Sequence, residues 1–105
     1  MKEADLVREI HQYLAIRKVW FFRASVGTCR VPSGRTVRFS TKGHPDFYCR
    51  SRPRKGAGPA RVLWIEAKTK TGKLSPEQED WKKTAERHGD LYVIARNLED
   101  VMGVV

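Results

Sequence analysis

Apolar residues recur at helical spacing near the start of the chain. The apolar positions recur at three- and four-residue steps, which places them on one side of a helix; they are Leu6, Val7, Ile10, Tyr13, Leu14 and Ile16. The pattern predicts an amphipathic helix over residues 3–17. Residues 19–26 are rich in aromatic and β-branched side chains, which predicts a strand.

Glycine, proline and serine interrupt the pattern in the middle of the chain. Residues 29–31 and 35–39 flank a Pro-Ser-Gly sequence, which predicts either a hairpin or an irregular basic loop. Residues 42–45 predict a turn, and residues 46–50 predict a short strand. Residues 51–60 contain no apolar anchor, so we expect a mobile loop there.

Clear strand and helix signals return in the second half. Residues 61–68 contain an apolar run that suits a strand buried on both faces. Ser75 is a suitable N-cap, Pro76 suits the first helical position, and Gln78 occupies the third position, where it can complete a capping box. These residues predict a helix that ends at Gly89.

The end of the chain completes the predicted fold. Residues 91–95 predict another strand, and Asn97 caps a short final helix. The predicted order is helix, four strands, helix, strand, helix. A length of 105 residues with 40% hydrophobic positions fits one domain with a real core. We therefore expect a single α/β domain over residues 1–105, in which helices flank a mixed β-sheet.

Composition excludes several classes of protein. No run approaches the roughly 20 apolar residues of a membrane helix, and the first residues do not lead into the apolar segment of a signal peptide. We therefore expect a soluble, cytoplasmic protein that does not bind membranes. Cys29 and Cys49 have neither metal-ligand nor disulfide-framework spacing, which argues against a zinc module or a disulfide scaffold.

Positive charge is concentrated in the middle of the chain. The formal net charge is +9, and the span from Arg17 to Arg61 holds 12 basic residues and a single acid, Asp46. The rest of the chain holds nine basic and eleven acidic residues. Basic charge gathered in one span predicts a polyanionic partner, most often nucleic acid. The alternative is a solubilising surface.

Charged residues also end the strongest predicted strand. Glu66 and Lys68 are two residues apart and so project from one face. If Asp46 opens the neighbouring strand, two carboxylates come close enough to repel each other, and a divalent cation removes that repulsion. Mg²⁺ or Mn²⁺ prefers oxygen ligands, so Asp46, Glu66 and the backbone carbonyl of Ala67 predict a metal site. Lys68 would stand beside a metal-bound water, where it could hold this water in line with a phosphorus atom and favour its hydroxide form. The alternative is an ion pair between Glu66 and Lys68, with Asp46 as a turn residue.

Three motifs together resemble the VRR-NUC domain, a branch of the PD-(D/E)xK nuclease superfamily. They are Gly43-His-Pro-Asp46, Ile65-Glu-Ala-Lys68 and Gly72-Lys-Leu-Ser-Pro-Glu-Gln78. The resemblance extends over nearly the whole chain and implies a restriction-endonuclease-like fold. It also implies a Mg²⁺- or Mn²⁺-dependent DNA endonuclease that hydrolyses phosphodiester bonds. The implied activity is structure-selective, on junctions or flaps or by nicking, in a bacterial cell or a phage-infected host.

The resemblance also assigns roles to particular residues. It implies that Asp46 and Glu66 bind metal and that Lys68 is catalytic. It further implies that Glu3 binds a second metal or its water shell, with Glu9 as a competitor, and that Gln78 orients the substrate or Lys68. Gln78 could alternatively serve only in the capping box. Members that resemble Holliday junction resolvases imply a homodimer acting on double-stranded or branched DNA.

Other side chains have a binding or a packing interpretation. The expected DNA-binding residues are Arg30, Arg35, Arg38, Lys42, Arg50, Arg52, Arg54, Lys55, Lys70 and Lys73. The aromatic residues are expected in the core, and not as platforms for base stacking; they are Trp20, Phe21, Phe22 and Trp64. Trp81 should pack on the sheet. The rival function is a non-catalytic nucleic-acid-binding module of a replication or repair complex, which would bind DNA without needing a metal.

Overall fold

A computed structural model describes residues 2–23, 28–30, 32–34, 36–38, 43–51 and 61–105. Three helices and six strands occur in this part of the chain. In chain order the elements are α1 (Glu3–Ile16), β1 (Trp20–Arg23), β2 (Thr28–Arg30), β3 (Thr36–Arg38), β4 (Phe47–Ser51), β5 (Arg61–Ala67), α2 (Pro76–Arg87), β6 (Leu91–Ala95) and α3 (Leu98–Met102).

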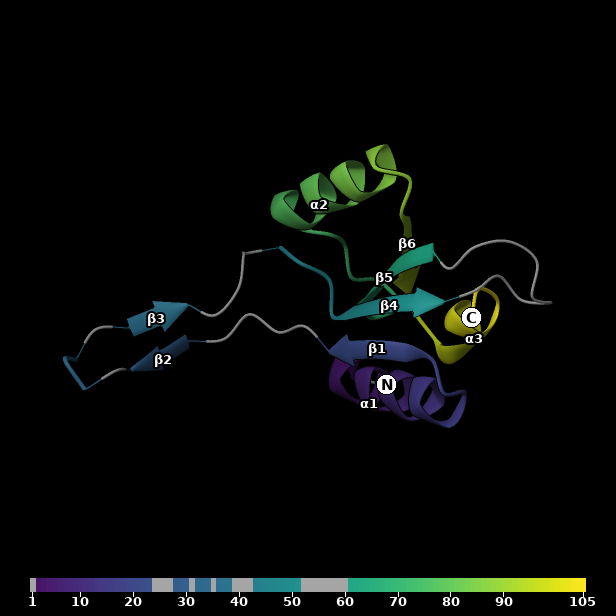
Figure 1. Ribbon diagram of the computed structural model, residues 1–105, viewed down its shortest axis with the longest axis horizontal. Coiled ribbons are helices and arrows are strands. Elements are labelled where there is room, and N and C mark those ends of the chain that lie inside the picture. Colours follow the sequence, from purple (N-terminus) through teal and green to yellow (C-terminus); the bar gives the residue numbers. More distant parts are fainter. Residues whose placement is uncertain (1, 24–27, 31, 35, 39–42, 52–60) are drawn as a thin grey trace.

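The main sheet is mixed, as the sequence predicts. Its strand order is β1-β4-β5-β6, in which β4 pairs antiparallel with both β1 and β5, and β5 pairs parallel with β6. A parallel pair needs a crossover connection, and α2 supplies it between β5 and β6. Helices α1 and α2 lie on opposite sides of this sheet (Figure 1).

The number of strands before α2 differs from the prediction. Strands β2 and β3 pair antiparallel as a separate two-stranded sheet, so the hairpin is confirmed and the irregular loop is wrong. Five strands therefore precede α2, and not four. The predicted strand 19–26 is described over Trp20–Arg23, and residues 52–60 of the predicted loop lie outside the described residues.

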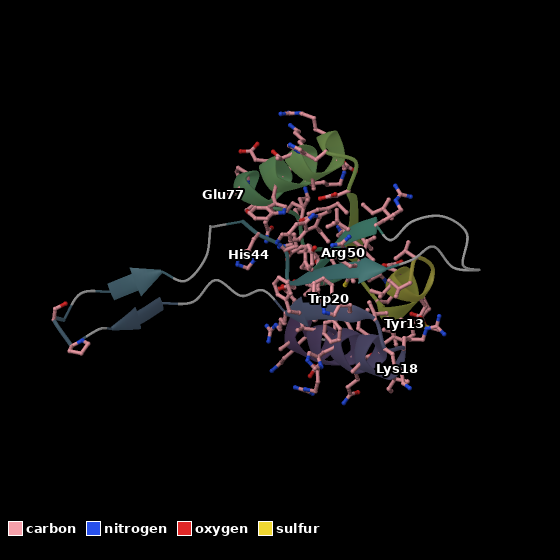
Figure 2. The ribbon with its side chains drawn as sticks, viewed as in Figure 1. Tyr13, Lys18, Trp20, His44, Arg50 and Glu77 are labelled. Carbon is pink, nitrogen blue, oxygen red and sulfur yellow. The ribbon has the colours of Figure 1, made fainter. Side chains whose placement is uncertain are left out.

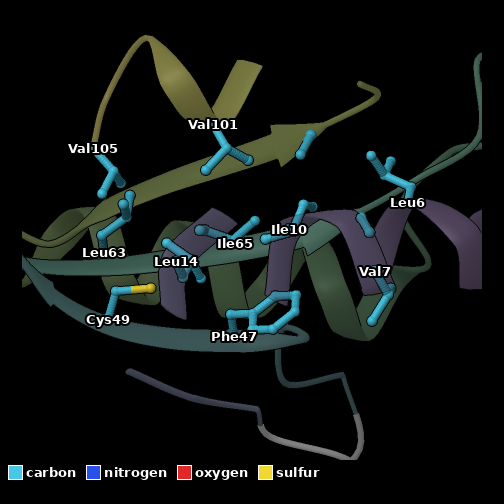
Figure 3. Packing of buried hydrophobic residues seen from close by; sticks show 12 residues of the cluster. Leu6, Val7, Ile10, Leu14, Phe47, Cys49, Leu63, Ile65, Val101 and Val105 are labelled. Carbon is cyan, nitrogen blue, oxygen red and sulfur yellow. The ribbon is translucent and has the colours of Figure 1, made fainter. Parts of the chain in front are cut away.

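The hydrophobic core lies between α1, α3 and one face of the sheet. Leu6, Ile10 and Leu14 of α1 are fully buried, as the helical spacing predicts. They belong to one cluster with residues of the two central strands and of the C-terminal end (Figure 3), including Phe47, Cys49, Leu63, Ile65, Val101 and Val105. The Tyr13 hydroxyl donates to the carbonyl of Val105 at 3.0 Å, which ties α1 to the last residue. Among the described helices, none is long and apolar enough to cross a membrane.

The opposite face of the sheet is only partly covered. Helix α2 packs Trp81 edge-on against Trp64, with ring centroids 5.5 Å apart, which confirms that Trp81 packs on the sheet. Trp20 and Phe22 on β1 are 66% and 55% exposed, so their predicted place in the core is wrong. Phe21 points to the core side, as expected. Aromatic content identified a strand here but could not reveal that β1 is an edge strand beyond the reach of α2.

Candidate metal centre

Three carboxylates from three elements meet at one end of the main sheet. Asp46 precedes β4, Glu66 lies near the end of β5, and Glu3 begins α1. The antiparallel pairing of Phe47 with Ile65 sets Asp46 opposite Glu66. One oxygen from each of Glu3, Asp46 and Glu66 lies within 4.8 Å of the other two. Residues 63 positions apart in sequence thus form one acidic cluster.

A backbone hydrogen bond fixes Asp46 in this cluster. The amide of Ala67 donates to Asp46 Oδ2 at 2.8 Å. The N–H and C=O of an extended residue point to the same neighbouring strand, so the carbonyl of Ala67 also points toward the Asp46 side. The predicted oxygen ligands from Asp46, Glu66 and Ala67 are therefore compatible with one site.

The Glu66 carboxyl is the most buried member of the cluster. The residue is 3% exposed, and its buried Oε1 has no hydrogen-bond partner among the described residues. Burial raises the pKa of Glu66 to about 8, and the nearby Asp46 and Glu3 carboxylates add to this effect. Lys68 acts in the opposite direction and lowers the pKa. A bare buried carboxylate is costly, so this position favours either a proton or a cation.

We expect the metal-free protein to lose stability as pH rises through the range set by Glu66. In the unfolded chain this carboxyl loses its proton near 4.5, whereas in the folded protein it keeps the proton until about 8. The folded state therefore binds more protons between these values, and the contribution of Glu66 to the free energy of unfolding falls across that window.

The measurement is urea denaturation in EDTA at several pH values between 4.5 and 8.5. Glu66→Gln should be less sensitive to pH than wild type, because a neutral amide replaces the titrating group. Glu9→Gln, on α1 but outside the cluster, should follow the wild-type curve. Parallel curves for wild type and Glu66→Gln would contradict the raised pKa.

Lys68 lies beside the acidic cluster at the edge of a groove. Its amide continues the parallel ladder by donating to the carbonyl of Ala95 at 2.9 Å. The groove is also lined by Glu3, Lys70 and Arg96. Among the described residues, no ion pair joins Glu66 to Lys68. The alternative of a simple strand-edge ion pair is therefore not found, and the lysine ammonium remains available beside the carboxylates.

Arg96 holds the loop that follows Lys68. Its Nη1 donates to the carbonyls of Thr69 at 2.7 Å and Gly72 at 2.8 Å, with a longer contact of 3.3 Å to Lys70. Three carbonyls bound by one guanidinium restrict the path of the chain directly after the site. The sequence gives Arg96 no role, because the residue only meets the loop through the parallel pairing of β5 with β6.

Gln78 serves in the capping box of α2. Its side-chain Oε1 accepts from the backbone N–H of Ser75 at 2.9 Å, and its backbone N–H donates to Ser75 Oγ at 3.2 Å. The capping interpretation is thus confirmed.

Of the two helix acids considered for the site, Glu3 belongs to the carboxylate cluster. Glu9 lies two turns further along α1, outside that cluster.

The turn before Asp46 depends on glycine. Gly43 has φ of +91°, and a Cβ built there would lie 2.7 Å from the carbonyl carbon of Glu77 at the start of α2. Gly43→Ala should therefore lower the free energy of unfolding by roughly 2 to 5 kcal/mol, from backbone strain plus overpacking.

Gly89 provides a matched control for this substitution. It has φ of +86°, yet nothing lies within 4 Å of its added Cβ. Gly89→Ala should therefore cost only the strain of about 1 to 2 kcal/mol. Urea denaturation of both variants measures the difference, and equal losses would contradict the close approach of Gly43 to α2.

Tyr92 on β6 also faces the site. Its hydroxyl is buried, and no residue that the structure describes forms a hydrogen bond with it. Burial and the carboxylates of Glu66 and Asp46 raise its pKa. Two unpartnered oxygens, from Tyr92 and Glu66, therefore lie on one face of neighbouring strands. The lone hydroxyl in the apolar strand 91–95 was a signal for this position that the sequence analysis did not use.

The predicted DNA-binding residues are only partly placed by the structure. Arg50 on β4 and Lys70 and Lys73 after β5 are exposed. Arg30 and Arg38 lie in the hairpin strands β2 and β3. The remaining predicted residues lie outside the described part of the chain; they are Arg35, Lys42, Arg52, Arg54 and Lys55.

The chain was compared with protein-family models and with curated proteins. No protein-family model and no curated protein matches the chain. The resemblance to the VRR-NUC domain consequently rests on the three sequence motifs and stays a prediction.

Proposed function

We propose that this chain is a Mg²⁺- or Mn²⁺-dependent deoxyribonuclease with a restriction-endonuclease-like fold of the VRR-NUC type. The observation that carries the proposal is the buried Glu66 carboxyl, which lies in a cluster with Asp46 and Glu3 and whose Oε1 has no hydrogen-bond partner in the described part of the chain. Such a carboxyl needs a positive charge or a proton beside it. The activity we propose is endonucleolytic hydrolysis of phosphodiester bonds.

The residues present fit a hard divalent cation. All the available ligands are oxygen atoms, from carboxylates and one backbone carbonyl, which Mg²⁺ and Mn²⁺ prefer over softer metals. Asp46, Glu66 and the carbonyl of Ala67 would hold the ion, with Glu3 supporting a second ion or the water shell. A bound ion would supply positive charge to the phosphate oxygens as negative charge develops on them.

The other roles belong to the side chains around the carboxylates. The Lys68 ammonium donates hydrogen bonds to the attacking water and to phosphate oxygens, which orients the nucleophile and offsets the growing negative charge. Gln78 retains its side-chain NH₂ for a substrate oxygen while its Oε1 caps α2. The exposed Lys70, Lys73 and Arg50 would contact phosphates without selecting sequence.

The basic span and the small size of the chain motivate proposals about its DNA partner and its oligomeric state. Arginines of the hairpin, of the predicted loop and of β4 would hold double-stranded or branched DNA. This would take place in the cytoplasm of a bacterial cell or of a phage-infected host. We also propose a homodimer, because two sites related by a two-fold axis cut paired strands. Sedimentation showing only monomers at working concentrations would contradict the dimer and leave the single-site chemistry untouched.

The direct test is a cleavage assay on four DNA substrates. Supercoiled plasmid, a Holliday junction, a flap and single-stranded DNA are each incubated with Mg²⁺, Mn²⁺ or EDTA. We expect cleavage with a divalent cation and none in EDTA. Cutting that survives EDTA would reject the metal mechanism. Salt-dependent DNA binding without cleavage of any substrate would favour the rival non-catalytic binding module.

A further inference from the structure

Aromatic side chains form a continuous row across the main sheet. The register aligns Phe22 on β1 with Tyr48 on β4, Tyr48 with Trp64 on β5, and Trp64 with Tyr92 on β6. Phe22 stacks on Tyr48 at 4.9 Å with 27° between the rings, and Tyr48 meets Trp64 edge-on at 5.0 Å. The row lies on the face opposite the hydrophobic core.

Only half of this row is covered. Trp81 of α2 packs on Trp64, and Tyr92 is buried. On the other half, Phe22 is 55% exposed, and its neighbour Trp20 is 66% exposed and meets Tyr48 only edge-on, at 6.3 Å. Phe22 stacks on Tyr48, yet Phe22 and Trp20 both keep more than half of their surface exposed. Trp20 and Phe22 are neighbours on one sheet face, so together they form a candidate interaction surface.

The open aromatic residues adjoin the acidic cluster. Asp46 and Glu66 project from the same sheet face as Tyr48 and Trp64, because Asp46 comes two residues before Tyr48 and Glu66 two residues after Trp64 in the antiparallel pair. Two residues of an extended strand span roughly 7 Å, so the row of aromatics and the row of carboxylates are direct neighbours. Phe22 therefore lies in the row next to the carboxylates, and Trp20 lies one row further from them, beside Arg50.

The charge near the open aromatics suits a polyanion. Arg50 pairs directly with Trp20 across β1 and β4 and is exposed on the same face. Figure 2 shows Trp20 and Arg50 on these neighbouring strands. The described strands β1 and β4 contain no acidic residue; their second arginine, Arg23, pairs with the core residue Phe47 and projects from the opposite face. Phosphates can lie beside this arginine while bases lie on the rings.

We propose that Trp20 and Phe22 form a stacking platform for unpaired nucleotides next to the site of cleavage. Every base has a flat aromatic face, so aromatic side chains bind single strands with little sequence preference. A base inside an intact duplex already stacks on its neighbours and cannot use the platform. The inference rests on the proposed nuclease function and specifies its substrate as DNA with an unpaired segment, such as a flap, a splayed end or a single strand.

Binding measured without metal tests the platform apart from cleavage. Fluorescence anisotropy in EDTA is recorded for three probes: a 12-nucleotide oligo-dT, a 12-base-pair duplex, and a 12-unit abasic sugar–phosphate strand. Trp20→Ala and Phe22→Ala should each weaken oligo-dT binding by roughly tenfold. Their affinities for the duplex and for the abasic strand should stay within about twofold of wild type, because these contacts are electrostatic.

Two control variants separate stacking from loss of exposed apolar surface. Trp20→Phe keeps an aromatic face and should retain most of the oligo-dT affinity. Ile16→Ala removes another exposed apolar side chain, 79% exposed at the end of α1, and should bind all three probes as wild type does. Thermal unfolding of each variant checks that the fold is retained.

The outcomes distinguish the platform from the nuclease proposal. Cleavage by wild type together with unchanged oligo-dT binding by both alanine variants would overturn the platform and leave the nuclease intact. Selective loss of oligo-dT binding in a protein that cleaves nothing would support the platform and remove the nuclease function. Conversion of a wild-type dimer to a monomer by Trp20→Ala, without selective loss of oligo-dT binding, would show a second copy of the chain on this face and overturn the platform.

Discussion

Lys68→Ala is expected to reduce DNA cleavage by roughly 10²- to 10⁴-fold, the range for loss of a group that moves a proton or stabilises charge in the transition state. The ammonium lies beside the carboxylate cluster without an ion pair to Glu66, so its charge is available for a substrate. The lysine is only partly buried, and its removal should therefore leave the fold intact. Single-turnover cleavage of the best substrate, with Mg²⁺ or Mn²⁺ present, measures the rate.

The matched control is Lys70→Ala, two residues further along. It removes the same charge from an exposed position beyond the strand and should weaken DNA binding modestly, with little change in the single-turnover rate at saturating enzyme. Lys68→Ala should show the reverse, a lost rate with DNA affinity near wild type. Wild-type rates in a homogeneous sample of Lys68→Ala would remove this residue from the mechanism.

Asp46→Asn should strongly weaken metal binding without unfolding the protein. An asparagine carbonyl can still accept from the Ala67 amide, which Asp46 Oδ2 now does at 2.8 Å. The substitution removes the negative charge that pairs with Glu66 to hold a cation. We expect Mn²⁺ binding to weaken by on the order of a hundredfold or more, since even outer groups of a metal site affect affinity by 10- to 100-fold, and cleavage to be lost with it.

Stability provides a readout that does not depend on activity. At a Mn²⁺ concentration 100 times its dissociation constant, a ligand that binds only the folded state adds about 2.7 kcal/mol to the free energy of unfolding. Wild type should gain this stabilisation, and Asp46→Asn should gain little at the same concentration. Asp80→Asn, an exposed acid on α2, should behave as wild type. Equal stabilisation of Asp46→Asn and wild type would place any bound metal elsewhere.

Local sequence patterns were sufficient for most of the elements. The spacing of apolar residues located α1, and the Ser75, Pro76 and Gln78 signals located the start of α2 because capping depends on neighbours in sequence. The same signals could not separate a hairpin from an irregular loop near Pro32. That choice depends on backbone pairing between β2 and β3, which the composition of each segment does not report.

The acidic cluster was also foreseen in part. Alternation along β5 placed Glu66 and Lys68 on one face, and a strand opened by Asp46 brought the second carboxylate near. Glu3 entered only through the family resemblance, because nothing in its own segment indicates which strand ends it approaches. Tyr92 was missed for the same reason, since its neighbours across β5 follow from the parallel register.

Local patterns were enough to predict most elements, the alternation of the strands and the grouping of Asp46, Glu66 and Lys68, because these properties depend on residues close together in the chain. Glu3 joins the two strand carboxylates, and Trp20 and Phe22 are exposed to solvent, through packing between distant segments. A strand's pattern assigns its residues to two faces, but what covers each face depends on helices distant in sequence, here α1 on one side and α2 over half of the other.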